Sequence, residues 1–127
     1  MLTDKITDKL ADLLFHHTKL CEVYLRWNSL SGVCGQKVFK VLLKGDTIKV
    51  LDLSWNVMGD NFKTTSSTQG CVDELRDFII TNESLVHFDL SNNYFNFKQC
   101  ENIAKALRRN QNIYGFHFTG NKGYLDA

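Results

Sequence analysis

The residues of this chain best suited to chemistry are Asp52, His87, Asp89 and His117. Carboxylates and imidazoles serve as general acids and bases, and they also bind divalent metals. The spacing that either use requires does not occur, because the sequence has no HxxxH pair and no activated nucleophile is evident near these residues. We therefore expect no catalytic role, no bound metal and no cofactor for these side chains.

The four cysteines could form a disulfide framework or a zinc site, but their positions favour neither. No CxxC spacing occurs, and the four histidines are scattered. Cys34, Cys71 and Cys100 fall on apolar faces of expected helices, where a free cysteine acts as a small hydrophobic residue. Cys21 lies at the start of an expected strand. We expect all four thiols to be reduced and structural.

The elements that position these side chains follow from a pattern that occurs four times. Each copy reads apolar-x-x-apolar-x-apolar-x-x-Asn-x-apolar, and only the last copy departs from it, at Gly123. This is the pattern of a leucine-rich repeat, whose units must stack on their neighbours to bury a core. The copies are Leu20–Leu30, Ile48–Met58, Leu85–Phe95 and Ile113–Gly123, aligned on Asn28, Asn56, Asn93 and Asn121.

A helix is expected before the first copy and between successive copies. The asparagines are spaced by 28, 37 and 28 residues, which leaves room for a full helix after each strand and turn. Asn82 and Asn110 are expected at helix ends. Apolar residues repeat at helical spacing in four groups: Ile6, Leu10, Leu13 and Leu14; Cys34, Val38, Phe39, Leu42 and Leu43; Val72, Leu75 and Ile79; Cys100, Ile103 and Leu107.

The predicted fold is a right-handed α/β solenoid of leucine-rich repeats, with a parallel sheet on the concave side and helices on the convex side. It forms one domain, 1–127, with a helical half-repeat at about 3–17, repeats at about 20–47, 48–84 and 85–112, and a partial repeat at 113–127. The middle repeat holds a nine-residue insertion within 59–70, which is expected as a rim loop. The loop could contact a partner, be phosphorylated on its Ser and Thr residues, or be a neutral insertion.

Residues 6–123 resemble the ribonuclease-inhibitor-like class of long leucine-rich repeats, most sharply in LDLSWN and FDLSNN. That class also includes Ran GTPase-activating proteins and the sensor domains of some innate immune receptors. Because the class mostly binds unrelated partners, the resemblance implies a protein-binding surface. It leaves open a GTPase-activating role, for which no local motif is present, and a spacer role in a cytoskeletal or ciliary assembly. The closing YGFHFTGNKGY looks like repeats of protist and ciliary leucine-rich proteins.

The repeated asparagines, Asn28, Asn56, Asn93 and Asn121, have a physical reason to recur. Backbone N–H and C=O groups lose their sheet partners where a strand ends and the chain turns. A buried Asn amide can bond to the turns of its own and the neighbouring repeat. We predict an asparagine ladder at these four positions, although each could also be a turn residue that tolerates left-handed geometry.

Partner binding is predicted on the concave strands and beside them. Alternation directs Val23, Leu25, Leu51, Leu53, Phe88, Leu90, Phe116 and Phe118 to the core and the residues between them to the concave surface. The candidate site combines aromatic, charged and histidine side chains, a mixture typical of protein interfaces. Its members are Tyr24, Arg26, Trp27, Asp52, Trp55, His87, Asp89 and His117. Trp27 and Trp55 could instead stack on each other only to shield the turns.

Composition and charge limit the partners and the cellular location that we expect for this chain. Fifteen basic and 14 acidic residues give a net charge of +1, which does not favour nucleic-acid binding. The start MLTDKITDKL lacks a secretory apolar core, and no run of 18 apolar residues could span a membrane. No helix pattern follows the fourth strand, so we expect either a fragment of a longer solenoid or self-association through the uncapped C-terminal edge. The predicted function is a non-catalytic, cytoplasmic protein-protein interaction module.

Overall fold

Helices and strands alternate along the whole described part of the chain. The computed structural model describes residues 2–59 and 71–122, so the predicted rim loop and the last residues of the fourth repeat lie outside the described residues. The elements are η1 (Asp4–Ile6), α1 (Thr7–His16), β1 (Glu22–Tyr24), α2 (Gly32–Leu42), β2 (Val50–Asp52), α3 (Val72–Thr81), β3 (His87–Asp89), α4 (Phe97–Leu107) and β4 (Gly115–His117).

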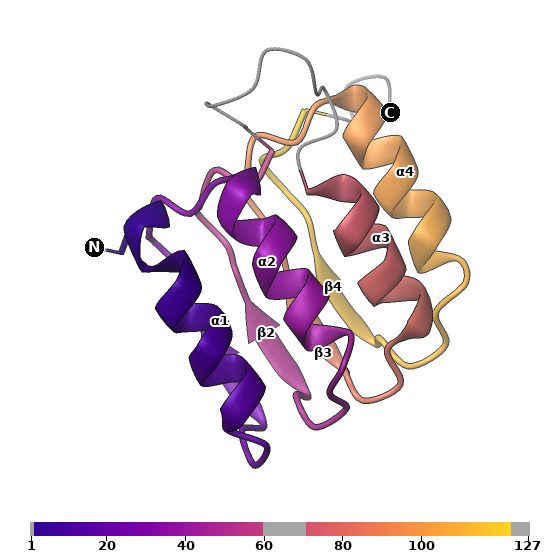
Figure 1. Ribbon diagram of the computed structural model, residues 1–127. Helices are drawn as coiled ribbons and strands as arrows, with labels where there is room; N and C mark the ends of the chain where they lie inside the picture. Colours follow the sequence, from indigo (N-terminus) through magenta and orange to yellow (C-terminus); the bar gives the residue numbers. More distant parts are fainter. Residues whose placement is uncertain (1, 60–70, 123–127) are drawn as a thin grey trace.

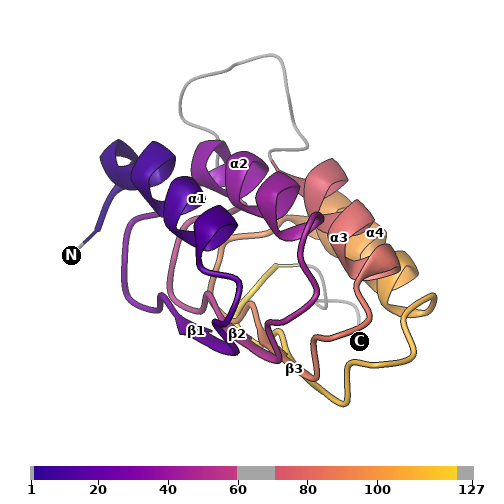
Figure 2. The same ribbon diagram turned by 60° about the horizontal axis from the view of Figure 1, so that its bottom comes forward.

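The four strands form one parallel sheet in the order β1-β2-β3-β4. The middle residues of the strands are paired in register: Val23, Leu51, Phe88 and Phe116. All four helices lie on one side of the sheet, as Figures 1 and 2 show. No described element covers the other side, which we call the open face. The predicted α/β class with a parallel sheet is confirmed, and the arrangement is that of a leucine-rich-repeat-like fold.

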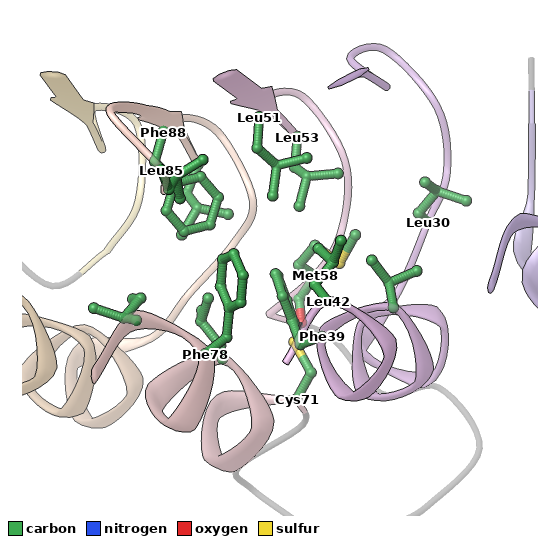
Figure 3. Close-up of a cluster of buried hydrophobic side chains, with 14 of the residues drawn as sticks. Leu30, Phe39, Leu42, Leu51, Leu53, Met58, Cys71, Phe78, Leu85 and Phe88 are labelled. Atoms are coloured by element: carbon green, nitrogen blue, oxygen red, sulfur yellow. Dashed lines mark hydrogen bonds between the residues drawn. The ribbon is translucent and has the colours of Figure 1, made fainter. Parts of the chain in front are cut away.

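The hydrophobic core lies between the sheet and the helices (Figure 3). Phe39 of α2, Phe78 of α3 and Phe88 of β3 meet there, with ring centroids of Phe39 and Phe78 5.6 Å apart and those of Phe78 and Phe88 6.1 Å apart. Leu51 and Leu53 approach these rings from the sheet. Each such side chain contributes about 1.5–3 kcal/mol by leaving water. The helical spacing in the sequence did not single out Phe78, although it is buried beside the predicted Ile79.

Side-chain caps hold the starts of α2 and α4. Ser31 Oγ accepts a hydrogen bond from the Val33 N–H at 3.2 Å before α2. Asn96 and Gln99 form a reciprocal capping box before α4, with both bonds 2.9 Å long. Caps of this kind contribute about 1 kcal/mol each. Because each of these caps follows a repeat asparagine by three residues, the turn after the strand is held at both of its ends.

Two residues of the predicted helix faces are exposed and correct the sequence prediction. Leu13 lies on α1, which is at the edge of the helix layer in Figure 1, so one side of its apolar stripe has no neighbouring helix. Leu43 is the C-cap of α2, beyond the last residue that faces the sheet. Helical spacing predicts which residues share a face but not whether a neighbour covers it.

Candidate functional site

Asparagine side chains hold the turns that follow the strands. Asn56 Nδ2 donates to the carbonyls of Leu25 and Leu53 at 2.9 and 3.0 Å. One of these carbonyls belongs to its own repeat and the other to the preceding repeat, so the amide bridges the two. The same bridging recurs twice: from Asn93 to Leu53 and Leu90 at 2.8 and 3.2 Å, and from Asn121 to Leu90 and Phe118 at 3.0 and 3.1 Å.

The asparagine oxygens bind backbone donors. Asn93 Oδ1 accepts from the Met58 N–H at 3.0 Å, and Asn56 Oδ1 accepts from the Leu30 N–H at 3.2 Å. Asn28, in the first repeat, donates to two carbonyls of its own repeat, those of Leu25 and Arg26, and its Oδ1 accepts from the Leu2 N–H at 2.5 Å. The turns of successive repeats are therefore joined by side-chain bonds, and the residues on these turns are held in a fixed arrangement.

The residue before each asparagine has a left-handed backbone. The φ angles are 59° at Trp27, 56° at Trp55, 56° at Asn92 and 80° at Gly120. The turn continues the pairing beyond the strand, because the Trp27 N–H donates to the Ser54 carbonyl at 3.1 Å and later repeats do the same. Left-handed geometry costs an ordinary L-residue about 1–2 kcal/mol, and only glycine, with asparagine to a lesser degree, avoids that cost.

Trp27 and Trp55 form a parallel stack. Their ring centroids are 4.3 Å apart and their planes differ by 8°. Both side chains still remain well exposed, at 58% for Trp27 and 42% for Trp55. An aromatic pair of this kind contributes about 0.5–1.5 kcal/mol beyond the burial of its area. The sequence left two roles open for these tryptophans, partner binding and stacking over the turns. The stack is present, and it leaves a large indole surface in contact with water.

A groove lies beside the stack. It has a volume of about 380 Å³ and is lined by Trp27, Trp55, Asn56, Val57, Asn92, Tyr94 and Gly120; we call it the aromatic groove. Tyr94 is 54% exposed, and Lys122 Nζ lies 6.0 Å from the centre of its ring. Sequence reasoning missed Tyr94, although it directly follows a repeat asparagine, as Val57 and Lys122 do. The residue after the repeat asparagine differs from copy to copy, and an aromatic residue there was the sequence signal that could have indicated Tyr94.

The open face carries the remaining predicted residues. Tyr24, Asp52, Asp89 and His117 are register partners across the four strands. Tyr24 is exposed, and its hydroxyl donates to Glu22 Oε1 at 2.6 Å. This bond to the carboxylate, more than any other influence, raises the pKa of Tyr24 above its usual value. Tyr24 is therefore a neutral, oriented phenol on the open face.

The structure corrects the expectation that Asp52 faces solvent. Asp52 is buried because its Oδ1 accepts hydrogen bonds from the Ser54 N–H at 3.0 Å and the Ser54 hydroxyl at 2.6 Å. Asp89 is half-buried and makes the corresponding bond to the Ser91 N–H at 2.9 Å. Both carboxylates hold the ends of their strands, so less of their surface is available to a partner than alternation alone indicated.

His87 and His117 lie against each other, with ring centroids 4.7 Å apart. Gly115 makes this possible, because a Cβ at that position would lie 2.4 Å from His87 Nδ1. Within residues 2–59 and 71–122, no group of three or more His, Cys, Asp or Glu side chains is arranged to hold a metal ion. The structure thus brings the two histidines together beside Asp89 without forming a recognisable metal site.

The predicted residues divide into two sets. Trp27 and Trp55 line the aromatic groove, whereas Tyr24, Asp52, His87, Asp89 and His117 lie on the strands of the open face. Arg26 is exposed between the two sets, one residue before Trp27.

All four cysteines are free thiols, and burial raises the pKa of Cys71 to about 12. Among the described helices, none combines the length and the apolar composition needed to cross a bilayer.

The fold and these surfaces define a leucine-rich-repeat-like α/β protein with one open sheet face. Neither a protein-family model nor a curated protein matches the chain. Among solved structures, the chain is similar to Leiomodin-1 Actin-Binding Site 2, with a TM-score of 0.76 and 17% sequence identity. The match covers 92% of this chain and 64% of that one, so this chain spans less than two thirds of that structure. At this identity, the likeness shows a shared fold.

Proposed function

We propose that this chain is a non-catalytic interaction module that binds another protein through the aromatic groove and the adjoining open face. The observation that carries the proposal is the exposure of Trp27, Trp55 and Tyr94 together in one groove. Tryptophan and tyrosine in such a position are the residue types most enriched at the energetic centres of protein interfaces. The neighbouring phenol of Tyr24 and the charge of Arg26 supply polar contacts around an apolar centre.

The rigidity of the surface supports the same proposal. The asparagine bonds and the left-handed turns fix the backbone under the indoles, so little conformational entropy is lost when a partner covers them. Exposed aromatic side chains on such fixed turns lose less conformational entropy on binding than aromatic side chains on flexible surface segments would lose. The groove is therefore the expected centre of the interface, and the strand residues are its surroundings.

Actin is the first partner to test, because the similar structure is an actin-binding site of leiomodin-1. The proposal also includes the long-repeat, ribonuclease-inhibitor-like class, which is supported by the full helices of 11, 10 and 11 residues that follow the first three repeat strands. A cytoplasmic setting is part of the proposal as well, supported by four free thiols.

Co-sedimentation and fluorescence titration with purified actin, as monomers and as filaments, test the partner. Trp55→Ala is expected to weaken binding at least about tenfold, since interface tryptophans commonly contribute about 2 kcal/mol or more. Tyr114→Ala is the matched control, because Tyr114 is an aromatic side chain that is 88% exposed and does not line the groove. Absence of binding at about 50 μM of either form, a concentration far above the dissociation constant of a specific complex, would exclude actin.

Affinity capture from a cell extract tests the binding function without a chosen partner. The wild-type chain and Tyr114→Ala are expected to retain the same proteins, and Trp55→Ala is expected to lose them while melting within a few degrees of the wild type. If Trp55→Ala retained the same proteins as the wild type, the groove would not be the binding surface.

A further inference from the structure

A second series of asparagines lies at the opposite ends of the strands, where helices return to the sheet. Asn110 Oδ1 accepts from the N–H groups of Asn112 and Ile113 at 2.7 and 2.9 Å. Its Nδ2 donates to the carbonyls of Ile79 and Asn82 in the preceding repeat, at 2.7 and 3.1 Å. Asn82 precedes β3 by the same interval and binds the N–H groups of the two residues that start its own connection, Ser84 and Leu85.

The series is interrupted one repeat earlier. Gly45 stands where the repeat pattern places an asparagine, three residues before Ile48. The carbonyls that correspond to the acceptors of Asn110 are those of Leu42 and Gly45, and the Asn82 side chain bonds to neither. Within the described residues, Asn82 Nδ2 has no hydrogen-bond partner, although the residue is only 7% exposed. The backbone donors at Oδ1 establish which side-chain atom is the nitrogen.

Leu42, Gly45 and Asn82, the residues of the missing bonds, all line one pocket. It has a volume of about 140 Å³, and its lining includes Leu14 of α1, Leu42 of α2 and Phe78 of α3, together with Ile48, which precedes β2, and Asn82. Figure 3 shows Leu42 and Phe78 extending from their helices toward the sheet. A second cavity of about 170 Å³ shares Leu42, Phe78 and Asn82 with the first. Asn82 lines both cavities, and among the described residues its Nδ2 is not one of the fully enclosed, unpaired atoms.

Charged and polar groups surround the opening. Lys44 lines both cavities, and its Nζ lies 5.9 Å from the centre of the Phe15 ring. His17 lines the first cavity, and Asp46 lines the second, where its Oδ1 accepts from the Glu83 N–H at 3.3 Å. An apolar space with an unused amide donor and an ammonium at its edge fits a molecule that is apolar at one end and accepts hydrogen bonds at the other.

We propose that this pocket binds a compact aromatic carboxylate. The ring would lie among Leu14, Ile48 and Phe78, because a cavity of about 150 Å³ with apolar walls accommodates benzene. The carboxylate would accept a hydrogen bond from Asn82 Nδ2 and lie toward the Lys44 ammonium. A ligand of this size, with about nine heavy atoms, is expected to bind with a dissociation constant of about 1 mM.

Titration of the isotope-labelled chain with benzoate tests the site by NMR. Saturable shifts are expected at the Asn82 side-chain amide and at Gly45, and benzyl alcohol and toluene are expected to bind at least about tenfold more weakly, since they lack the anionic acceptor. Asn82→Asp keeps the Oδ1 acceptor for the backbone while it removes the donor, and we expect it to reduce benzoate affinity more than about tenfold.

Two further variants distinguish specific recognition of the carboxylate from nonspecific binding in an apolar cavity. Lys44→Met is expected to weaken benzoate binding about threefold, whereas Lys40→Met removes an exposed charge that lines neither cavity and should leave the affinity unchanged. The proposal is overturned if benzoate produces no saturable shifts, if toluene binds as well as benzoate, or if Asn82→Asp melts like the wild type and binds benzoate equally well.

Discussion

Replacement of Asn93 by alanine removes the side chain that joins the second and third turns. Asn93 is fully buried, and its Oδ1 is the acceptor for the Met58 N–H at 3.0 Å. Its Nδ2 donates to the carbonyls of Leu53 and Leu90, each of which also receives a bond from the amide of a neighbouring asparagine. Nδ2 also donates to the Ser91 carbonyl at 3.2 Å. Alanine would therefore leave one buried N–H without this acceptor and three carbonyls with one donor fewer.

The cost follows from these bonds. An unsatisfied buried N–H costs about 1–3 kcal/mol, and each weakened carbonyl adds about 0.5 kcal/mol. The sum is about 3.5 kcal/mol, which corresponds to a fall in Tm of about 10–15 °C for a chain of this length. Urea unfolding of the wild type and Asn93→Ala, followed by circular dichroism, measures the difference directly.

Asn28→Ala is the matched control for this prediction. Asn28 is only half-buried, and its Nδ2 donates within its own repeat. Its Oδ1 accepts from the Leu2 N–H of the preceding half-repeat, but that bond is exposed, so we expect a loss of about 1 kcal/mol. Equal losses in the two variants would show that buried bridging between repeats does not contribute. If Asn93→Ala unfolded within about 1 °C of the wild type, the reasoning that these amides hold the turns would be refuted.

Two other changes have defined outcomes. Gly59→Ala would place a Cβ 2.5 Å from the carbonyl carbon and oxygen of Tyr94, so urea unfolding should show a loss of more than about 2 kcal/mol, whereas Gly45→Ala, with open space around it, should change little. The Cys71 thiol should resist a thiol reagent at about pH 8 that modifies the exposed Cys21. Because the pKa of Cys71 is raised from 9.0 to about 12 on folding, the unfolded state loses this proton first, and stability should fall as pH rises above about 9.

The repeat pattern was sufficient to predict the strands, their parallel order and the helices between them. The reason is that both periodicities are set by burial: Leu51 and Leu53 alternate toward the core, and Val38 and Leu42 recur on one helix face. The pattern could not predict the exposure of Leu13, since that depends on whether another helix lies beside α1. Sequence periodicity describes a face, and the surrounding structure decides whether that face is covered.

The candidate site was less predictable for a different reason. Alternation places Asp52 on the open face, but a hydrogen bond to Ser54 two residues later turns the carboxylate into a buried support for the strand end. Tyr94 falls outside the strand, so no alternation rule applies to it, and its contact with the groove arises from the turn. Local hydrogen bonds of short side chains and the direction of turns are therefore the parts of a site that a repeat pattern leaves undetermined.

The position before each repeat asparagine shows why the groove is the centre of the proposal. The left-handed turn is best served by glycine or asparagine, and the third and fourth repeats have Asn92 and Gly120 there. Trp27 and Trp55 each carry about 1–2 kcal/mol of backbone cost in the same conformation, and their stacking returns about 0.5–1.5 kcal/mol for the pair beyond the area that it buries. The turn itself therefore gives no reason for tryptophan at either position. Strained backbone clusters at functional sites, so these two left-handed tryptophans support the proposal that a partner covers the exposed indoles.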